Sequence, residues 1–492
     1  MSRTRGARQT GVGSLGARTR LAGLDRRSLG QAEVAAQSVS VMAPCAAGAT
    51  VPLLIAESGA AVVSSILIAV LLAGLVSRVL TEFTSRMAAP GVLYTFAAKG
   101  LGSGAGFATA AAMVLGYGAL TMFTLTEAAA YALRAVGVDR PTVGTLIAVL
   151  VGVAAISAVI LLRGIRLSAR VSLVVEAIAV AILLVVALVV VMTVRGDGDV
   201  GDVVVVAPTG VADFATGVAL ATCALIGFES AASLSVEARR PLRSIPRAIR
   251  GSLVVGAVVV VIASVAQAVA RSAVTPAPHG SAASLDRLVE RIGDGWLAPI
   301  VDIGVVASFV ACALACVTAL ARLLLSLSRE GVISPRFGST HVRFKTPTFA
   351  ITASLVIVTA TPVLMTLAGV DLRAMTGSLA TASVIGFITS YVAVSVAAPF
   401  FLHRVGELRP SVAVTAGVAA AAFGGIEVVF VGVVLGTDWA LGAIGALSWF
   451  AATLVVYVVL RRSRPDALAG IGIHETPTRA DIWRGHAEVM SG

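Results

Sequence analysis

The feature that most constrains this chain is a series of long apolar segments that recur along nearly its whole length. Twelve of them reach about 18 residues or more, the length that an α-helix needs to cross the hydrocarbon core of a bilayer. Hydrophobic residues make up 58% of the 492 residues and charged residues only 13%. The sequence therefore predicts an all-α polytopic membrane protein with twelve transmembrane helices. They lie near 31 to 56, 60 to 80, 106 to 133, 142 to 162, 171 to 194, 213 to 236, 249 to 270, 297 to 327, 348 to 368, 374 to 402, 412 to 435 and 438 to 460.

The basic residues are distributed unevenly across these helices. An even number of helices places both termini on one side, and most of the 37 Lys and Arg residues fall on that side. This positive-inside pattern predicts cytoplasmic termini, and the preference for Arg over Lys is typical of a GC-rich bacterial genome, so we expect the bacterial cytoplasmic membrane. The net charge of +11 then reflects topology and contact with anionic membrane lipids, without a nucleic-acid partner. The basic residues in the expected outer loops are Arg134, Arg140, Arg195, Arg271, Arg287, Arg291 and Arg373.

The chain divides into four segments by composition. Residues 1 to 30 are rich in Arg, Gly, Ser and Thr and predict a disordered cytoplasmic tail. Residues 31 to 402 hold helices 1 to 10, and residues 403 to 460 hold helices 11 and 12. Residues 461 to 492 are polar and basic, which predicts a second cytoplasmic tail that is loosely ordered.

Helix 6 carries a carboxyl group in its middle. The residues are Gly227, Phe228, Glu229 and Ser230, with apolar runs on both sides. A charge at this depth costs roughly 2.5 to 3.5 kcal/mol on insertion scales, so it must face a partner, a cavity or a substrate. The alternative is a glycine needed for close helix contact, beside a protonated glutamate bonded to a neighbouring helix.

Helix 1 carries a second interruption. Pro44 lacks an amide donor and lies in a run of small residues that leaves the backbone uncovered. Irregular backbone at mid-membrane persists only where it is buried in protein or lines a cavity, so the run is a candidate binding segment. A simple proline kink is the alternative. The run consists of Ala43, Pro44, Cys45, Ala46, Ala47 and Gly48.

Helices 1 and 6 have equivalent positions, because each begins a block of five helices. Interrupted helices at equivalent positions indicate an inverted repeat with a binding site near the bilayer midplane. The amides that follow the break in helix 1 suit an anionic group, and carbonyls freed at both breaks suit an ammonium group. A zwitterion the size of an amino acid meets both demands.

Four stretches resemble one transporter superfamily over about residues 25 to 460. The stretch Gly227 to Ala232, with the motifs after it at 237 to 241 and 245 to 249, resembles the helix 6 signature of the amino acid-polyamine-organocation permeases. Residues 89 to 94 resemble the end of helix 2 in these permeases, and residues 164 to 170 the start of helix 5. Residues 321 to 347 resemble the loop between helices 8 and 9.

The resemblance implies a five-plus-five inverted repeat with two additional helices, which transports amino acids or related amines by alternating access. It also implies that backbone from Ala43 to Gly48 holds the substrate carboxylate and that Phe228 covers the substrate. Glu229 would belong to a hydrogen-bond network between helices 6 and 1. Many members have a Gly-Ser-Gly-like turn where this chain has Ala43-Pro44-Cys45, which leaves the individual carboxylate contacts open.

We expect a transporter that is coupled to H⁺ or Na⁺, or an exchanger. Some proton-coupled members place a lysine in helix 5, whereas this chain offers Glu176. Glu229 and Glu176 are the candidates for a proton route, because burial favours the neutral form of a carboxyl group. Ser308 is the candidate for a sodium ligand, or a helix-contact residue. Tyr117 on helix 3 falls at a depth that faces the site, or it fills space between helices.

The sequence predicts no enzymatic activity, no metal site and no cofactor. The five histidines fall in loops or tails, so no catalytic base is expected at membrane depth. The small, apolar residues around the two breaks favour a neutral amino acid as the substrate. The alternatives are a transporter of polyamines or other organic amines and a membrane amino-acid sensor that does not transport; the individual substrate and the oligomeric state stay open.

Overall fold

The computed structural model describes residue 24 and residues 27–138, 140–163, 165–194, 210–272, 297–341 and 345–472. Within these residues the chain is helical and contains no β-strand. Eleven described helical spans are long and apolar enough to cross a membrane. The twelfth expected crossing, near 213 to 236, is a 13-residue helix followed by turns and a short 3-10 helix, so it does not reach the length of the others.

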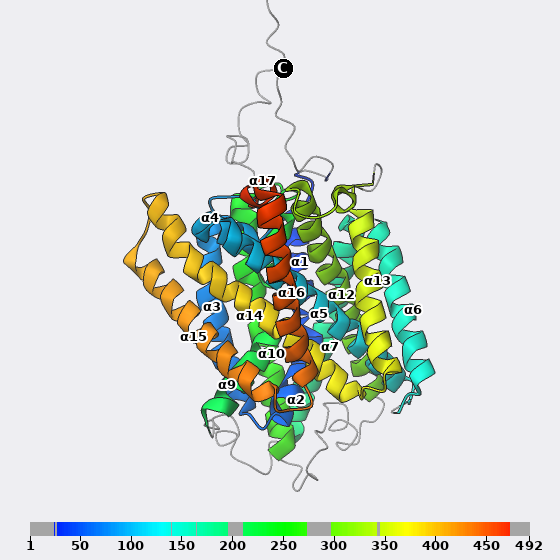
Figure 1. Cartoon of the computed structure of the whole chain (residues 1–492). Helices are drawn as coiled ribbons and strands as arrows, with labels where there is room; N and C mark the ends of the chain where they lie inside the picture. The colour runs from blue at the N-terminus through cyan, green and yellow to red at the C-terminus, as the bar shows by residue number, and fades with distance from the viewer. Residues whose placement is uncertain are drawn as a thin grey trace, which may run out of the picture.

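The bounds of the elements follow the expected order, with labels as in Figure 1. They are α1 (Gln31–Met42), α2 (Pro44–Glu57), α3 (Val62–Thr84), α4 (Leu93–Leu101), α5 (Ser103–Ala135), α6 (Val143–Leu162), α7 (Ile165–Val194), α9 (Val211–Cys223), η1 (Ser230–Leu234), α10 (Pro241–Ser272), α12 (Leu297–Arg329), η2 (Pro335–Gly338), α13 (Thr348–Leu367), α14 (Leu372–Arg404), α15 (Pro410–Val434), α16 (Ala440–Ser463) and α17 (Pro465–Ala469).

The long helices lie roughly side by side, as a membrane-spanning bundle requires (Figure 1). Helix α5 packs along both α12 and α14, and α1 packs against α7, α10 and α12. The outer helices present large apolar side chains on their free faces: Leu71, Val428 and Leu454 are each more than 60% exposed. Such surfaces are favourable in lipid and costly in water, which agrees with the membrane class.

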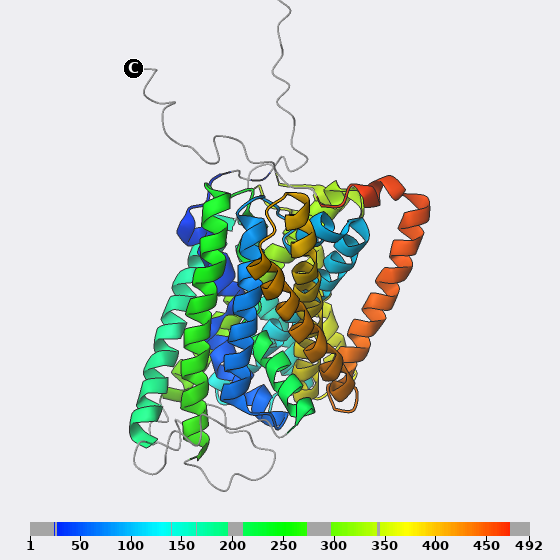
Figure 2. The same cartoon turned by 90° about the vertical axis from the view of Figure 1, so that its left-hand side faces the viewer.

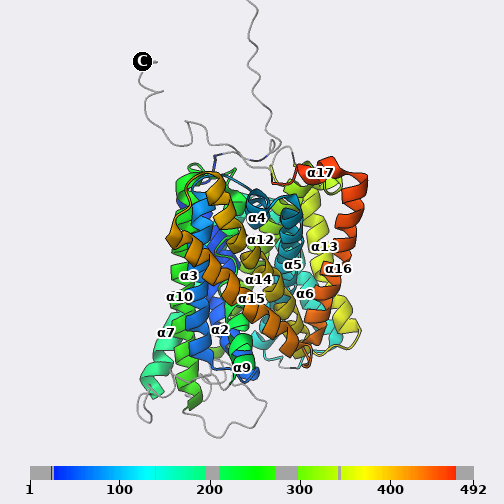
Figure 3. The same cartoon turned by 60° about the vertical axis from the view of Figure 1, so that its left-hand side comes forward.

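Both described ends of the chain lie on one face, at the top of Figure 1, and we call it the terminal face. The two broken crossings run in opposite directions between this face and the opposite face. Leu29, just before α1, forms a parallel bridge with Ala238, just after the helix 6 segment. At the other end, α2 and α9 pack together (Figure 3). An antiparallel pair agrees with the predicted inverted repeat, which itself stays a prediction.

Three short regions differ from the sequence analysis. Helix α4 was not predicted; it lies at the terminal face between α3 and α5. Residues 27–30 are paired with the helix 6 segment rather than free, and residues 465–472 include α17, with Leu468 and Ile471 buried. Two or three apolar side chains are enough to dock such short segments, and they leave little signal in an otherwise polar tail. Residues 1–23, 25, 26 and 473–492 of the expected tails lie outside the described residues.

Candidate functional site

Helix 1 breaks at Ala43. Its backbone has φ 43° and ψ 62°, the left-handed region, and this ends α1 at Met42 and starts α2 at Pro44. Proline is favourable as the first residue of a helix, because the amide that it lacks would have no partner there. The left-handed conformation of a non-glycine residue costs roughly 1 to 3 kcal/mol, and such strain persists where surrounding contacts hold it.

Two buried side chains accept hydrogen bonds from the first amides of α2. The amide of Cys45 donates to Glu176 Oε1 at 3.1 Å, and the amide of Ala46 donates to Ser308 Oγ at 3.1 Å. Glu176 comes from α7 and Ser308 from α12, and both are buried. A helix N-terminus carries partial positive charge, so a carboxylate is favourable there. Two residues proposed for ion coupling therefore meet at the segment proposed to hold the substrate carboxylate.

The helix 6 break touches the helix 1 break at Gly227. Its φ of +110° lies in the left-handed half of backbone space, which glycine adopts at little cost. A Cβ atom there would lie 2.3 Å from Val41 Cγ1 and 3.0 Å from the amide nitrogen of Met42. The positive φ and the short Cβ distances both require glycine. The short distances also show that the two breaks are in direct contact.

Hydrogen bonds join helix 1 to the helix 6 segment beside these breaks. Ser38 Oγ donates to the carbonyl oxygen of Phe228 at 2.8 Å and accepts from the amide of Ala231 at 2.9 Å. Ser230 Oγ donates to the carbonyl oxygen of Gln37 at 3.3 Å. These bonds satisfy backbone groups that the interrupted helix 6 leaves without helical partners.

The carboxyl group of Glu229 bonds to α5, to α14 and to the backbone of its own break, rather than to helix 1. Oε1 accepts from the hydroxyl of Tyr117 on α5 at 3.0 Å, and Oε2 accepts from the hydroxyl of Tyr391 on α14 at 2.9 Å and from the amide of Gly227 at 3.1 Å. The side chain is fully buried. Glu229 thus joins the helix 6 break to α5 and α14, whereas Ser38 and Ser230 join helix 6 to helix 1.

Phe228 is buried in a group of aromatic rings. Its ring centroid lies 5.6 Å from that of Tyr391, which in turn lies 5.9 Å from that of Phe423. Tyr391 therefore has two roles, because its ring supports Phe228 while its hydroxyl binds Glu229. Sequence analysis did not identify Tyr391 or Ser38, since a single hydroxyl-bearing residue in an apolar helix carries no distinguishing pattern.

The terminal face is closed beside the site. Arg322 and Glu237 form a bidentate ion pair with N–O distances of 2.9 and 2.6 Å, and both side chains are at most 3% exposed. Leu29 pairs with the same segment through its amide, which donates to the carbonyl oxygen of Glu237 at 2.9 Å. These contacts fasten the segment before α1 and helix α12 to the end of the helix 6 segment.

The opposite face holds a polar cavity of about 860 Å³. It is lined from α2, α5 and α14 by charged residues that include Glu57, Glu127, Arg134 and Arg373. Arg373 and Glu57 form an ion pair of 2.6 Å at its edge, where the Arg373 side chain is half exposed. The two faces therefore differ, with a buried closure at one and a charged cavity at the other.

A family model of amino acid permeases matches residues 29–462. The chain belongs to the amino acid permease family. The matched range contains both broken helices, Glu176, Ser308 and the two tyrosines bonded to Glu229. The family consists of transporters rather than enzymes. Among the described residues of this permease, no group of three or more His, Cys, Asp or Glu side chains is placed to hold a metal ion.

Shorter similarities link this permease to curated relatives. It is 33% identical over 124 residues to an uncharacterized transporter of Mycobacterium tuberculosis, which covers 25% of this chain and 28% of the relative. It is 28% identical over 144 residues to the branched-chain amino acid permease BcaP of Bacillus subtilis, covering 28% and 30%. The BcaP of Lactococcus lactis is 31% identical over 128 residues, covering 26% and 27%. Each match thus spans less than a third of the relative.

Proposed function

We propose that this permease is a secondary transporter that moves neutral, branched aliphatic amino acids across the bacterial cytoplasmic membrane. The observation that carries the proposal is the contact between the two broken helices at Gly227 and Met42, beside the N-terminus of α2, whose first amides bond to Glu176 and Ser308. At such paired breaks a helix N-terminus suits a carboxylate, and freed carbonyl oxygens suit an ammonium group. The names of the two BcaP relatives support a branched-chain substrate.

The substrate carboxylate binds at the N-terminus of α2, and its ammonium group binds carbonyl oxygens that the breaks release. Glu229 already accepts hydrogen bonds from Tyr117, Tyr391 and the amide of Gly227, which leaves it at most one acceptor site for a cationic side chain. Small and apolar neighbours such as Cys45 and Cys223 leave an aliphatic side chain in a matching environment. A polyamine would instead require further carboxylates at this depth.

The coupling ion is a proton carried by Glu176. Its carboxylate and that of the substrate compete for the same helix end, since Glu176 already accepts from the amide of Cys45. Protonation removes the charge of Glu176 and weakens its hold on that helix end, which favours substrate binding. Glu229 bonds instead to Tyr117, Tyr391 and Gly227, whereas Glu176 bonds to the helix end at which the substrate carboxylate is placed. Sodium binding at Ser308 is the alternative.

Transport requires the terminal face to open while the opposite face closes. The terminal face is cytoplasmic in this proposal, so the buried Arg322–Glu237 pair closes the inner side while the charged cavity opens to the outside. Release into the cell requires the helix 6 segment to separate from α12 and from residues 27–30. The two breaks supply the points at which the half-helices move.

Uptake into proteoliposomes tests this function. Radiolabelled leucine, isoleucine and valine should accumulate when the lumen is at pH 7.5 and the outside at pH 5.5, and unlabelled spermidine or arginine should not compete. Saturable leucine binding without uptake or exchange would favour the sensor. Competition by spermidine with none by valine would favour the amine transporter, and accumulation that follows a sodium gradient at equal pH would replace the proton.

A further inference from the structure

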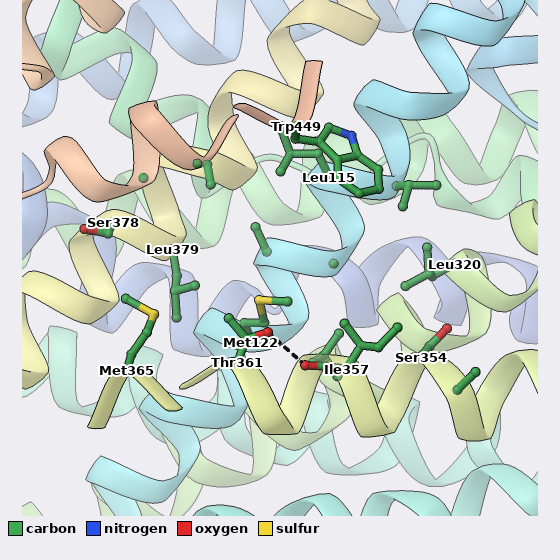
Figure 4. Close-up of a pocket in the computed structure, with 18 of the residues that line it drawn as sticks. Leu115, Met122, Leu320, Ser354, Ile357, Thr361, Met365, Ser378, Leu379 and Trp449 are labelled. Carbon is green, nitrogen blue, oxygen red and sulfur yellow. Dashed lines mark hydrogen bonds between the residues drawn. The ribbon is translucent and has the colours of Figure 1, made fainter. Parts of the chain in front are cut away.

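A second cavity lies away from the two breaks, along the middle of α5. It has a volume of about 550 Å³, within the range of about 300 to 1,000 Å³ that is typical of small-ligand pockets. Its lining comes from α5, α13 and α16, with further residues from α12 and α14. In Figure 4, Trp449 and Leu115 lie across the cavity from Thr361 and Ile357. We call it the α5 groove.

The α5 groove lies between α13 and α16, which both pack on α5. Near the opposite face, Gly377 and Gly442 bring α14 and α16 into close contact: Cβ atoms on these glycines would meet Trp439 and the Ser378 backbone. Further along, Trp449 Nε1 donates to the carbonyl oxygen of Ala111 on α5 at 2.9 Å. Figure 2 shows α16, in orange and red, leaning outward from the bundle toward the terminal face. The wall formed by α13 packs instead against α5, α6 and α12.

The mouth of the α5 groove opens to the bilayer rather than to water. Ile357 is 60% exposed and Leu441 is 52% exposed, and Gly445 is also exposed. These residues belong to α13 and α16, both long and apolar enough to span the membrane. Molecules that reach this opening therefore arrive from within the lipid phase, and an acyl chain matches the apolar lining.

Two features add polar recognition to the apolar lining. Ser354 Oγ is buried in the lining without a hydrogen-bond partner, and it lies on the half of α13 nearer the terminal face. The terminal face carries exposed arginines: Arg336 precedes the lining residue Phe337, and Arg461 and Arg462 lie in the last turn of α16. A buried hydroxyl favours an acceptor such as an ester carbonyl, and exposed arginines favour a lipid phosphate.

We infer that the α5 groove binds one acyl chain of an anionic glycerophospholipid from the leaflet at the terminal face. The chain lies between α13 and α16 against Leu115, Gly118 and Met122, its ester carbonyl accepts from Ser354, and its headgroup is held by Arg336 and the arginines of α16. The bound chain would support the side of α5 that lies behind Tyr117, the partner of Glu229.

The groove contains its own reporter, Trp449. We would replace Trp296, Trp439 and Trp483 by phenylalanine, reconstitute the full chain and titrate phospholipids with dibrominated acyl chains, which quench tryptophan fluorescence on contact. Brominated phosphatidylglycerol should quench Trp449 at a mole fraction about fivefold or more below that of brominated phosphatidylcholine, because each basic residue near an anionic headgroup contributes about a factor of five. Arg336→Gln with Arg461→Gln and Arg462→Gln should remove that preference.

A matched pair of glycines separates groove binding from general lipid contact. A Cβ atom at Gly445 meets no atom within 4 Å, and the same holds for Gly425 on α15, which does not line the groove. Gly445→Leu should fill the groove and shift the phosphatidylglycerol titration to several-fold higher mole fraction, while Gly425→Leu leaves it unchanged. Ser354→Ala should shift it in the same direction as Gly445→Leu.

Equal titrations for Gly445→Leu, Gly425→Leu and the parent would overturn the groove as the binding site. Equal quenching by the two headgroups would overturn the anionic lipid. If a cysteine at Leu441 crosslinks two copies in the bilayer and brominated lipids leave Trp449 unquenched, a second copy of the chain covers the groove and the inference fails. The fluorescence readout does not depend on transport, so it stands apart from the proposed function.

Discussion

The amide of Cys45 donates to Glu176 Oε1 at 3.1 Å, so a buried carboxyl group from α7 caps the half-helix α2. This contact joins two sequence predictions that were made separately, the substrate-carboxylate segment and an acid on helix 5. In the proposed function, the substrate carboxylate displaces Glu176 from this helix end. Proton and substrate binding are coupled if both compete for it.

Glu176→Gln should remove the pH dependence of uptake between pH 5.5 and 7.5, because glutamine stays neutral over this range while keeping the shape of the side chain. Exchange of internal for external leucine should persist, since the amide of Cys45 remains available. The measurement is uptake and counterflow in proteoliposomes at both pH values. Glu427→Gln is the matched control: Glu427 is a partly buried acid on α15 that bonds to Thr389, away from the breaks. Unaltered pH dependence in Glu176→Gln would assign coupling to another group.

Tyr391→Phe should weaken the hold on Glu229 while it preserves the ring that supports Phe228. Loss of a hydrogen bond typically costs about 0.5 to 1.5 kcal/mol, so thermal stability should fall and KM should rise. Tyr457→Phe serves as the control, because its ring packs on Phe107 far along α16.

A double substitution tests whether the Tyr391 effect acts through Glu229. In a Glu229→Leu background the acceptor oxygens are absent, so adding Tyr391→Phe should cost clearly less than in the wild type. Additive losses in stability and in KM would show that the hydroxyl of Tyr391 acts independently of Glu229.

Arg322→Met should destabilise the protein by about 3 to 5 kcal/mol, because it leaves Glu237 buried without its ionic partner. Adding Glu237→Leu should restore much of the loss, since an apolar pair replaces a desolvated ionic pair. The restored variant should open more easily at the terminal face, which accessibility of a cysteine placed at Ser235 would measure. Arg373→Met, in the exposed pair with Glu57, should change stability by only about 0 to 1 kcal/mol. Identical cysteine labelling in the restored variant and the wild type would remove this pair from the closure.

The sequence predicts most of the fold because membrane crossing imposes a length and a composition that are visible without tertiary information. The eleven long described spans follow from this rule. The two breaks are also predictable, since Pro44 and Gly227 have backbone properties that interrupt a helix. Helix α4 is too short to reach the length threshold, and its apolar face only acquires meaning once α5 and α14 pack against it.

The partners within the site are less visible in the sequence than the breaks. Glu176, Glu229 and Ser308 stand out because they are polar at apolar depth, and the structure places each of them beside a break. Which residue each one binds depends on helix rotation and tilt, and those are set by contacts between distant segments. Tyr391 lies 162 residues from Glu229, and its hydroxyl group leaves no mark that distinguishes it from an aromatic residue that only fills space.

Gly227→Ala tests whether the contact between the two breaks is required for transport. The added methyl group would lie 2.3 Å from Val41 Cγ1, and alanine would have to adopt a φ of +110°, so two separate costs fall on one substitution. We expect the half-helices to separate and leucine uptake to fall by at least about tenfold, which corresponds to roughly 1.4 kcal/mol, while enough folded protein remains to measure. Gly425→Ala is the control, because its Cβ meets no neighbour and its φ is not positive. Uptake by Gly227→Ala at the wild-type rate, in protein that elutes as a single species, would show that the breaks do not need this contact.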